Sequence, residues 1–189
     1  MNIIINQNSA LIVVDMQNDF IEGNLKVPNS DTIIPIINQY INFFENNDLM
    51  IIFTRDWHPE GHCSFKENGG IWPKHCVQNT YGSQFHKDLY TPKKNFHIIS
   101  KAYQKDIEAY SGFQQTELHN LLQKNNINTL FICGVATDYC VKQTVLSALD
   151  LKYNVYLLVD AIKGVDINPN DSENAINEII KKGAKLLVI

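Results

Sequence analysis

The sequence predicts an α/β fold: a doubly wound six-stranded parallel sheet in the order 3-2-1-4-5-6, with helices on both faces. Two observations lead to this prediction. Short apolar runs with the length of buried strands alternate along the chain with segments whose apolar residues recur at helical spacing. This alternation is typical of parallel α/β sheets. The 189 residues contain no linker, repeat or low-complexity tract, so we expect one domain spanning 1–189.

Six segments have the pattern of buried strands, and most of them stop at a polar or charged residue. They are 9–14, 49–54, 95–100, 130–133, 155–159 and 185–189. Gly134 interrupts the fourth run, so we expect that strand to end there. A segment at 57–82 lacks such patterns and is rich in Gly, His, Pro and Trp. Connections of this length in compact domains are usually functional.

Helical spacing follows four of these strands, at about 31–44, 116–125, 137–149 and 171–182. Ser30 and Asp31 are candidate N-caps of the first helix, and Pro35 is tolerated in its first turn. Asn170 and Asp171 are candidate caps of the last helix, for which Gly183 is a suitable residue just past the end.

Composition and charge exclude several classes of protein. Hydrophobic residues at 44% and charged residues at 19% indicate an ordinary folded protein, and a net charge of −4 without a Lys/Arg cluster gives no footprint for nucleic acid. The early apolar runs are too short for a membrane span and lack the flanks of a signal peptide. Four cysteines without a C-x-x-C pair indicate reduced thiols, and hence a cytoplasmic protein.

Four chemically active residues follow the first four predicted strands. In a sheet of the predicted order, the carboxyl ends of the strands meet at one edge, where ligands bind at the switch point between strands one and four. This places Asp15, Asp56, Lys101 and Cys140 together. The stretch after the first strand reads DMQNDF rather than a glycine-rich loop, so nothing supports dinucleotide binding.

Cys140 lies in the first turn of a helix that begins just past a strand. Free N–H groups and the helix dipole there lower the pKa of a thiol and can stabilise an oxyanion, which favours a nucleophile. The position also suits a small apolar filler, since cysteine is among the most buried residue types. Asp15 as a base and Lys101 as a nearby cation favour the nucleophile, although a turn cap and a surface lysine are the simpler interpretations of these two residues.

A second cluster of ligand-type residues begins at Asp56. Asp56 and His58 share a side of an extended chain, so both can face one cation. A third ligand from His75 or His62 gives two histidines and a carboxylate with open positions, a set that suits zinc, iron or manganese. Histidines on loops are also common as plain surface residues. Cys63 and Cys76 are weaker candidates, because their spacing matches no structural zinc site.

Five ordered blocks, ALIVVDMQNDF, FTRDWHPEGHCSF, IWPKHCVQNTYGSQFH, SKAY…AYSGF and GVATDYCV, resemble the nicotinamidase family of the isochorismatase-like cysteine hydrolase superfamily. The resemblance implies hydrolysis of nicotinamide to nicotinate and ammonia, as in NAD salvage, with pyrazinamide also accepted. It implies a small aromatic carboxamide as the partner, neither nucleic acid nor membrane, and leaves a homo-oligomer open.

The resemblance also assigns roles to individual residues. It implies Cys140 as nucleophile, Asp15 as general base and Lys101 as the third member of the triad. It implies a cis Val135–Ala136 peptide, with the N–H groups of Ala136 and Cys140 forming an oxyanion hole. The implied substrate-binding residues are Phe20, Trp72, Tyr110 and Val135. The implied divalent metal, with zinc preferred over iron or manganese, is held by Asp56, His58 and His75, and in some members by His62.

One residue departs from the family pattern, and two other functions compete with the one implied. Glycine commonly follows the lysine, whereas this chain has Ala102, which leaves the backbone conformation there open. A related amidase or an isochorismatase would use the same fold, but the isochorismatase type lacks the metal cluster. A non-catalytic ligand-binding or metal-storage relative is disfavoured by the complete set of Cys140, Asp15 and Lys101.

Overall fold

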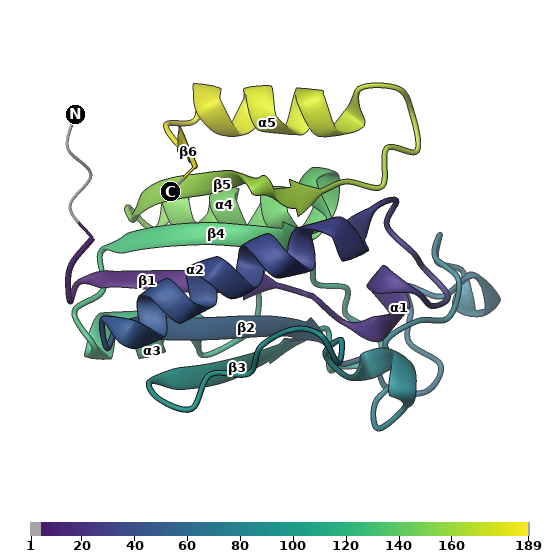
Figure 1. Ribbon diagram of the computed structural model, residues 1–189. Helices are drawn as coiled ribbons and strands as arrows, with labels where there is room; N and C mark the ends of the chain where they lie inside the picture. The colour runs from purple at the N-terminus through teal and green to yellow at the C-terminus, as the bar shows by residue number, and fades with distance from the viewer. Residues whose placement is uncertain (1–4, 189) are drawn as a thin grey trace.

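The computed structural model describes residues 5–188, and its six-stranded parallel sheet has the order β3-β2-β1-β4-β5-β6 (Figure 1). The predicted fold class and strand order are confirmed, and all five neighbouring strand pairs are parallel. The strands are β1 (Ser9–Val14), β2 (Met50–Asp56), β3 (Phe96–Lys101), β4 (Thr129–Val135), β5 (Asn154–Lys163) and β6 (Lys185–Leu187).

Three strands are longer than their apolar runs predict, and β2 ends two residues later than predicted, at Asp56. β4 continues through Gly134, which pairs with Val14 of β1, so the glycine does not end the strand. Gly134 has a φ of +109° at a register shift between β4 and β5, and its missing side chain lets the neighbouring strand approach closely. β5 runs four residues past the predicted end, to Lys163. β6 ends at Leu187, and Ile189, the predicted end of the last strand, lies outside the described residues.

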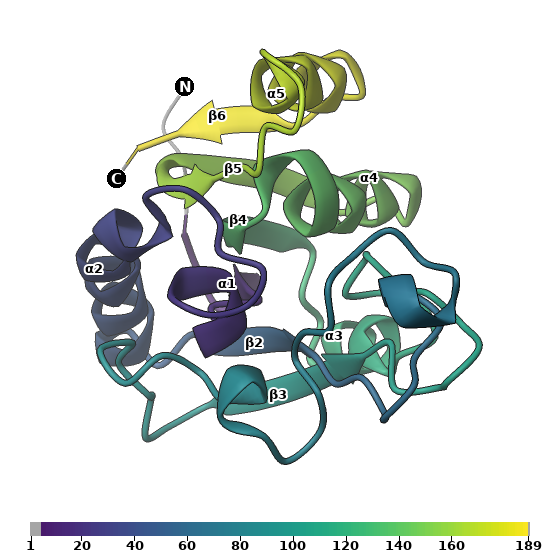
Figure 2. The same cartoon turned by 90° about the vertical axis from the view of Figure 1, so that its right-hand side faces the viewer.

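Helices cover both faces of the sheet, as predicted (Figure 2). They are α1 (Asn18–Ile21), α2 (Ile34–Asn46), α3 (Leu118–Lys124), α4 (Lys142–Asp150) and α5 (Asp171–Lys181). Residues of α2 pack with Leu11, Val13 and Phe131 on one face, and residues of α3, α4 and α5 pack with Ile12 and Ile132 on the other. Successive side chains of β1 and β4 point to opposite faces of the sheet and therefore belong to two separate apolar cores.

The predicted caps of α2 are wrong. A 3₁₀ turn, η1 (Ser30–Ile33), precedes the helix, and neither Ser30 nor Asp31 caps it. Ser30 is fully buried, and its hydroxyl donates instead to the carbonyl of Phe20 at 3.0 Å, because the turn packs against the segment after β1. At the last helix Asn170 holds the N-cap position with a φ of +70° but makes no side-chain cap bond.

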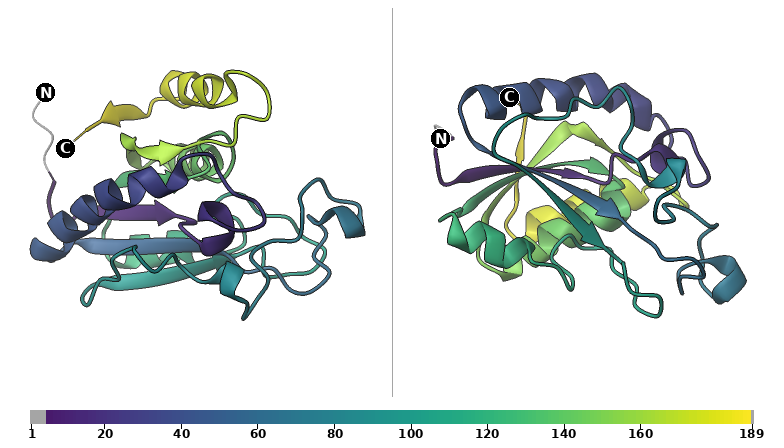
Figure 3. Two further views of the ribbon diagram at one scale, coloured as in Figure 1. Left: turned by 45° about the vertical axis from the view of Figure 1, so that its right-hand side comes forward. Right: turned by 90° about the horizontal axis from the view of Figure 1, so that it is seen from below.

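The segment between β2 and β3 is mostly irregular and extends beyond the carboxyl ends of the strands (Figures 1 and 3). Its regular pieces are two 3₁₀ turns, η2 (Lys66–Asn68) and η3 (Tyr81–Ser83). Two isolated bridges, His58 to Val77 and Phe65 to Trp72, fold it back on itself. Along residues 5–188, no helix has the length and apolarity to cross a bilayer.

Replacement of Gly134 by alanine should severely destabilise the protein. The added Cβ would lie 2.1 Å from the carbonyl oxygen of Val14, at a φ of +109° that disfavours a side chain. We expect a loss of more than about 3 kcal/mol in the free energy of unfolding, measured in urea. Gly183→Ala is the matched control, because Gly183 has a φ of +112° but nothing within 4 Å of the added Cβ. It should cost only about 1 kcal/mol, and equal losses would contradict the steric argument.

Candidate active site

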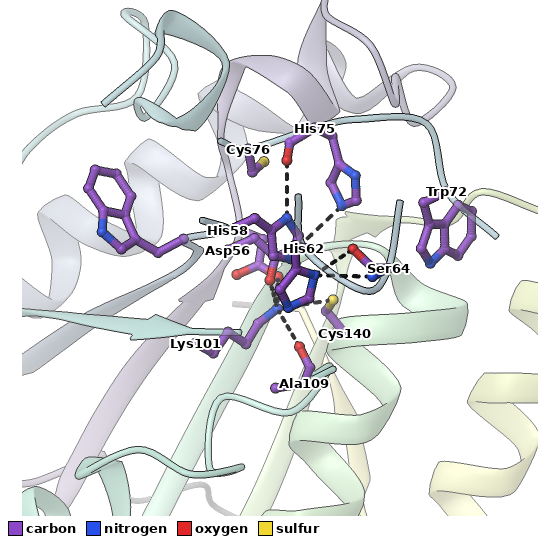
Figure 4. Close-up of polar contacts among 12 residues, drawn as sticks. Asp56, His58, His62, Ser64, Trp72, His75, Cys76, Lys101, Ala109 and Cys140 are labelled. Atoms are coloured by element: carbon purple, nitrogen blue, oxygen red, sulfur yellow. Dashed lines mark hydrogen bonds and ion pairs between the residues drawn. The ribbon is translucent and has the colours of Figure 1, made fainter. Parts of the chain in front are cut away.

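Four strand ends bring together the residues predicted to meet there, and Figure 4 shows Asp56, Lys101 and Cys140 among them. Asp15 follows β1, Asp56 and Lys101 are the last residues of β2 and β3, and Cys140 lies in η4 (Thr137–Val141). η4 is a π-helical turn between β4 and α4. The Nζ of Lys101 lies 2.9 Å from Oδ2 of Asp15 and 3.4 Å from Sγ of Cys140, and it also donates to Oδ1 of Asp56.

Lys101 is a fully buried cation between two buried carboxylates. Burial alone would lower the pKa of its ammonium group, but Asp15 and Asp56 raise this pKa well above its ordinary value. Burial raises the pKa of Asp15 in spite of Lys101. On Asp56 burial acts in the same direction, but Lys101, His58 and His75 outweigh it and lower the pKa. Lys101 is therefore charged, and Asp15 is the more basic of the two carboxylates.

The pKa of Cys140 corrects one expectation from the sequence. Burial raises the pKa of this thiol well above its ordinary value, and the carboxylates of Asp15 and Asp56 add to the rise although Lys101 opposes it. The expected lowering by the start of the helix is wrong, because desolvation and two negative charges outweigh it. Cys140 rests as a thiol, within 4.8 Å of a carboxylate oxygen of Asp15 that can accept its proton.

Asp56, His58 and His75 form a group whose ligand atoms all lie within 4.8 Å of one another. Oδ2 of Asp56 is 4.0 Å from Nε2 of His58 and 3.9 Å from Nε2 of His75. Asp56 thus offers one oxygen to Lys101 and the other to the two imidazoles. The three side chains are buried, which is typical of a prepared site rather than of surface histidines.

The state of His58 fits a divalent cation at this place. Its Nδ1 donates to the carbonyl of His75 at 3.0 Å, so the lone pair of Nε2 faces the group. Burial lowers the pKa of His58 to about 4, which makes the ring neutral at pH 7 and able to ligate. Nε2 is buried and has no hydrogen-bond partner within residues 5–188. A cation would satisfy this atom and offset the excess of carboxylate charge over Lys101.

His62 lies beside this group but has both ring nitrogens engaged. Its ring stacks on His58 with centroids 4.3 Å apart. Nε2 donates to the carbonyl of Ile107 at 3.1 Å, and Nδ1 accepts the N–H of Ser64 at 3.2 Å with the Ser64 hydroxyl at 2.8 Å. In this conformation His62 has no free lone pair for a metal and supports His58 through stacking.

A pocket opens onto both groups. It is lined by Phe20, Leu25, Val27, Asp56, Trp72, His75, Tyr110, Ala136, Tyr139, Cys140 and Val165. Phe20, Trp72 and Tyr110, which the resemblance implies as substrate-binding residues, are among these lining residues, and Nε1 of Trp72 donates to the hydroxyl of Tyr110 at 2.9 Å. Val135 does not line the pocket, because strand alternation buries its side chain in the core with Val13 and Cys133. The Val135–Ala136 peptide is cis.

Sequence reasoning missed four lining residues. Leu25, Val27 and Val165 come from irregular segments, where no periodicity marks an inward side chain. Tyr139 precedes Cys140 and packs edge-on against Trp72 with centroids 4.9 Å apart, so its place beside the predicted nucleophile could have identified it. Ala102, which replaces a glycine common in the family, has a φ of +52°, the left-handed region that glycine favours.

The isochorismatase domain model matches residues 9–188. The nicotinamidase of Escherichia coli is 37% identical over an alignment 202 positions long, which covers 95% of this chain and 94% of that protein. A pyrazinamidase of Pyrococcus horikoshii, solved in complex with zinc, is 49% identical with a TM-score of 0.91, covering 96% of this chain and 99% of that one. The yeast nicotinamidase bound to the inhibitor nicotinaldehyde is 30% identical with a TM-score of 0.88, covering 96% and 100%.

Replacement of Lys101 by methionine should cost about 3–5 kcal/mol of unfolding free energy at pH 7, because it leaves two buried carboxylates without their cation. Burial and mutual repulsion would raise the folded-state pKa of both carboxyls above their unfolded value of about 3.9. Below these raised pKa values both carboxyls are neutral in the folded protein and need no cation. The loss of unfolding free energy should therefore be small near pH 4 and grow as the pH rises. Urea unfolding with chelator present measures this difference.

Lys142→Met is the matched control for this prediction. Lys142 makes a partly exposed ion pair with Glu178 at 3.5 Å. Removing such a pair should cost under about 1 kcal/mol and give no comparable pH slope. A loss for Lys101→Met that does not change between pH 4 and pH 7 would contradict the proposed charge balance.

Proposed function

The chain belongs to the isochorismatase family, and we propose that it is a single-domain, metal-assisted cysteine amidase that hydrolyses nicotinamide to nicotinate and ammonia, with pyrazinamide as a second substrate. One observation carries this proposal. A single aromatic-lined pocket is bordered both by Cys140 and by Asp56 and His75 of the ligand group. A flat heteroaromatic carboxamide can therefore present its carbonyl carbon to the thiol while its ring lies among Phe20, Trp72 and Tyr110.

The first chemical step begins from the protonated thiol. As Sγ of Cys140 attacks the carboxamide carbon, its proton passes to the carboxylate of Asp15, which burial has made more basic. Lys101 stays charged throughout and stabilises the negative charge that moves between Sγ and Asp15. This pairing lets the enzyme avoid a free thiolate and needs no catalytic histidine.

The second step releases ammonia. The negative charge on the former carbonyl oxygen would be stabilised by the N–H groups of Ala136 and Cys140, both of which border the pocket. Asp15 returns its proton to the leaving nitrogen, the C–N bond breaks, and a thioester forms on Cys140. Asp15 then takes a proton from water as the water oxygen attacks the thioester. The C–S bond breaks, Asp15 gives that proton to Sγ to restore the thiol, and the acid product loses its proton to solvent and leaves as nicotinate.

Asp56, His58 and His75 would hold one divalent metal, for which we propose zinc, because a relative of 49% identity is solved in complex with zinc. When bound, the metal would supply a Lewis acid for the ring nitrogen of the substrate and for water. His75 lies at the pocket wall with its ring centroid 5.6 Å from that of Phe20. The ligand group and the aromatic side chains of the pocket would together orient the ring.

Cys140→Ala should abolish release of ammonia from nicotinamide, with kcat lowered by roughly 10⁴-fold or more. Binding of nicotinamide, measured by titration calorimetry, should remain, because the ring contacts come from other residues. Cys63→Ala is the control. Cys63 does not border the pocket, so this variant should hydrolyse nicotinamide at the normal rate. Retained hydrolysis by Cys140→Ala would rule out the nucleophile.

Removal of the metal by a chelator should raise KM for nicotinamide by about tenfold or more. A rise of this size corresponds to the loss of one moderate binding contact. The reason is that orientation of the ring is shared by the ground state and the transition state. Added Zn²⁺ should restore the original KM in a steady-state assay of ammonia. An unchanged KM in protein confirmed to be metal-free would remove the metal from substrate binding.

A further inference from the structure

Two buried residues of the segment after β1, Gln17 and Asp19, do not border the pocket, yet both hold backbone next to the candidate metal ligands. We propose that they are positioning residues for the metal site, acting through the main chains of Asp56 and Cys76. The inference rests on the metal site of the proposed function. It gives a role to two of the three polar residues that lie between Asp15 and Phe20.

The side chain of Gln17 hydrogen-bonds to both the backbone N–H and the backbone carbonyl of Asp56. Its Oε1 accepts the N–H of Asp56 at 2.8 Å, and its Nε2 donates to the carbonyl of Asp56 at 2.8 Å and to that of Ser83 at 3.0 Å. The side chain is fully buried, so water cannot replace these bonds. A shift of Asp56 along β2 would break two of them at once.

The position of Gln17 explains why a side chain is needed there. β1 ends at Val14, and the last backbone bond between its end and β2 runs from the N–H of Asp15 to the carbonyl of Thr54 at 3.2 Å. The chain then turns away from the sheet. The carboxamide of Gln17 takes the place of the next peptide group and continues the ladder by one step, to the residue that carries the ligand oxygen.

Asp19 holds the backbone on the histidine side of the candidate metal site. Its Oδ2 accepts the N–H of Cys76 at 2.7 Å, and its Oδ1 accepts the N–H of Asn24 at 3.1 Å. The carbonyl of Cys76 in turn accepts the N–H of His58 at 3.1 Å. Cys76 directly follows His75 (Figure 4), so one residue held by Asp19 is joined to both ligand histidines, to His75 through the chain and to His58 through its carbonyl.

The backbone around Asp19 closes tightly on its carboxylate. A Cβ at Gly82 would lie 2.0 Å from Oδ2, and one at Gly23 would lie 2.3 Å from Oδ1. Glycines at these two places let the chain approach the carboxylate from two sides. Together, Gln17 and Asp19 fix the ligand residues without touching the metal, as partners of metal ligands generally do.

The decisive experiment is a titration of metal-free protein with Zn²⁺ alone, in competition with a chromophoric chelator. Gln17→Glu keeps an acceptor for the N–H of Asp56 but places a carboxylate oxygen against the carbonyls of Asp56 and Ser83. We expect its affinity for Zn²⁺ to fall by about 10–100-fold. Asp19→Asn, which leaves one acceptor for two N–H groups, should give a similar fall and serves if Gln17→Glu does not fold.

Asn18→Asp is the matched control. Asn18 lies between the two residues, is buried, and donates from its amide to the carbonyl of Tyr81 at 2.9 Å, but it contacts no backbone of a ligand residue. Wild-type affinity in Asn18→Asp beside weak binding in Gln17→Glu supports the proposal. Equal weakening in both, or unchanged binding in folded Gln17→Glu and Asp19→Asn, overturns it. Because no substrate is used, normal Zn²⁺ binding without nicotinamide hydrolysis would count against the proposed function alone.

Discussion

The ammonium group of Lys101 is the interaction on which the whole site depends. It is fully buried and lies between the carboxylates that follow or end two neighbouring strands, with the thiol of Cys140 on its third side. Without this cation, two carboxylates would face each other in a region from which water is excluded. The same charge links Cys140 to Asp56, and through Asp56 to the candidate metal ligands. The proposed triad and the candidate metal site are therefore one electrostatic unit.

The parallel sheet makes this unit possible with little special local structure. Each participating residue needs only to follow or end a strand, because the sheet order aligns the ends of β1 to β4 at one edge. This is also why so much could be predicted from sequence. The strand positions follow from apolar runs, and Asp15, Asp56, Lys101 and Cys140 follow from where those runs stop. The wall residues Phe20, Trp72 and Tyr110 came from resemblance alone.

What sequence could not predict depends on distant packing. The raised pKa of Cys140 reflects burial and the two carboxylates, neither of which local sequence near a helix start reveals. Ser30 looks like a helix cap, but its hydroxyl bonds to Phe20 because the turn packs against another segment. Gly134 breaks an apolar run in the sequence yet lies inside β4, since only the neighbouring Val14 shows why a side chain is excluded. Leu25, Val27 and Val165 reach the pocket from irregular loops that carry no pattern.

A neutral thiol at Cys140 has consequences for how the protein reacts with other reagents. Alkylating agents and peroxides react with thiolates, so a buried, protonated Cys140 should be a slow target for both. The partly exposed Cys63 is more accessible to such reagents, but it does not line the pocket that Cys140 borders. Covalent labelling of the Cys140 sulfur would then depend on compounds that enter the aromatic pocket and allow its proton to pass to Asp15, as proposed for a carboxamide. Selectivity in this protein would come from shape and proton transfer rather than from a reactive sulfur.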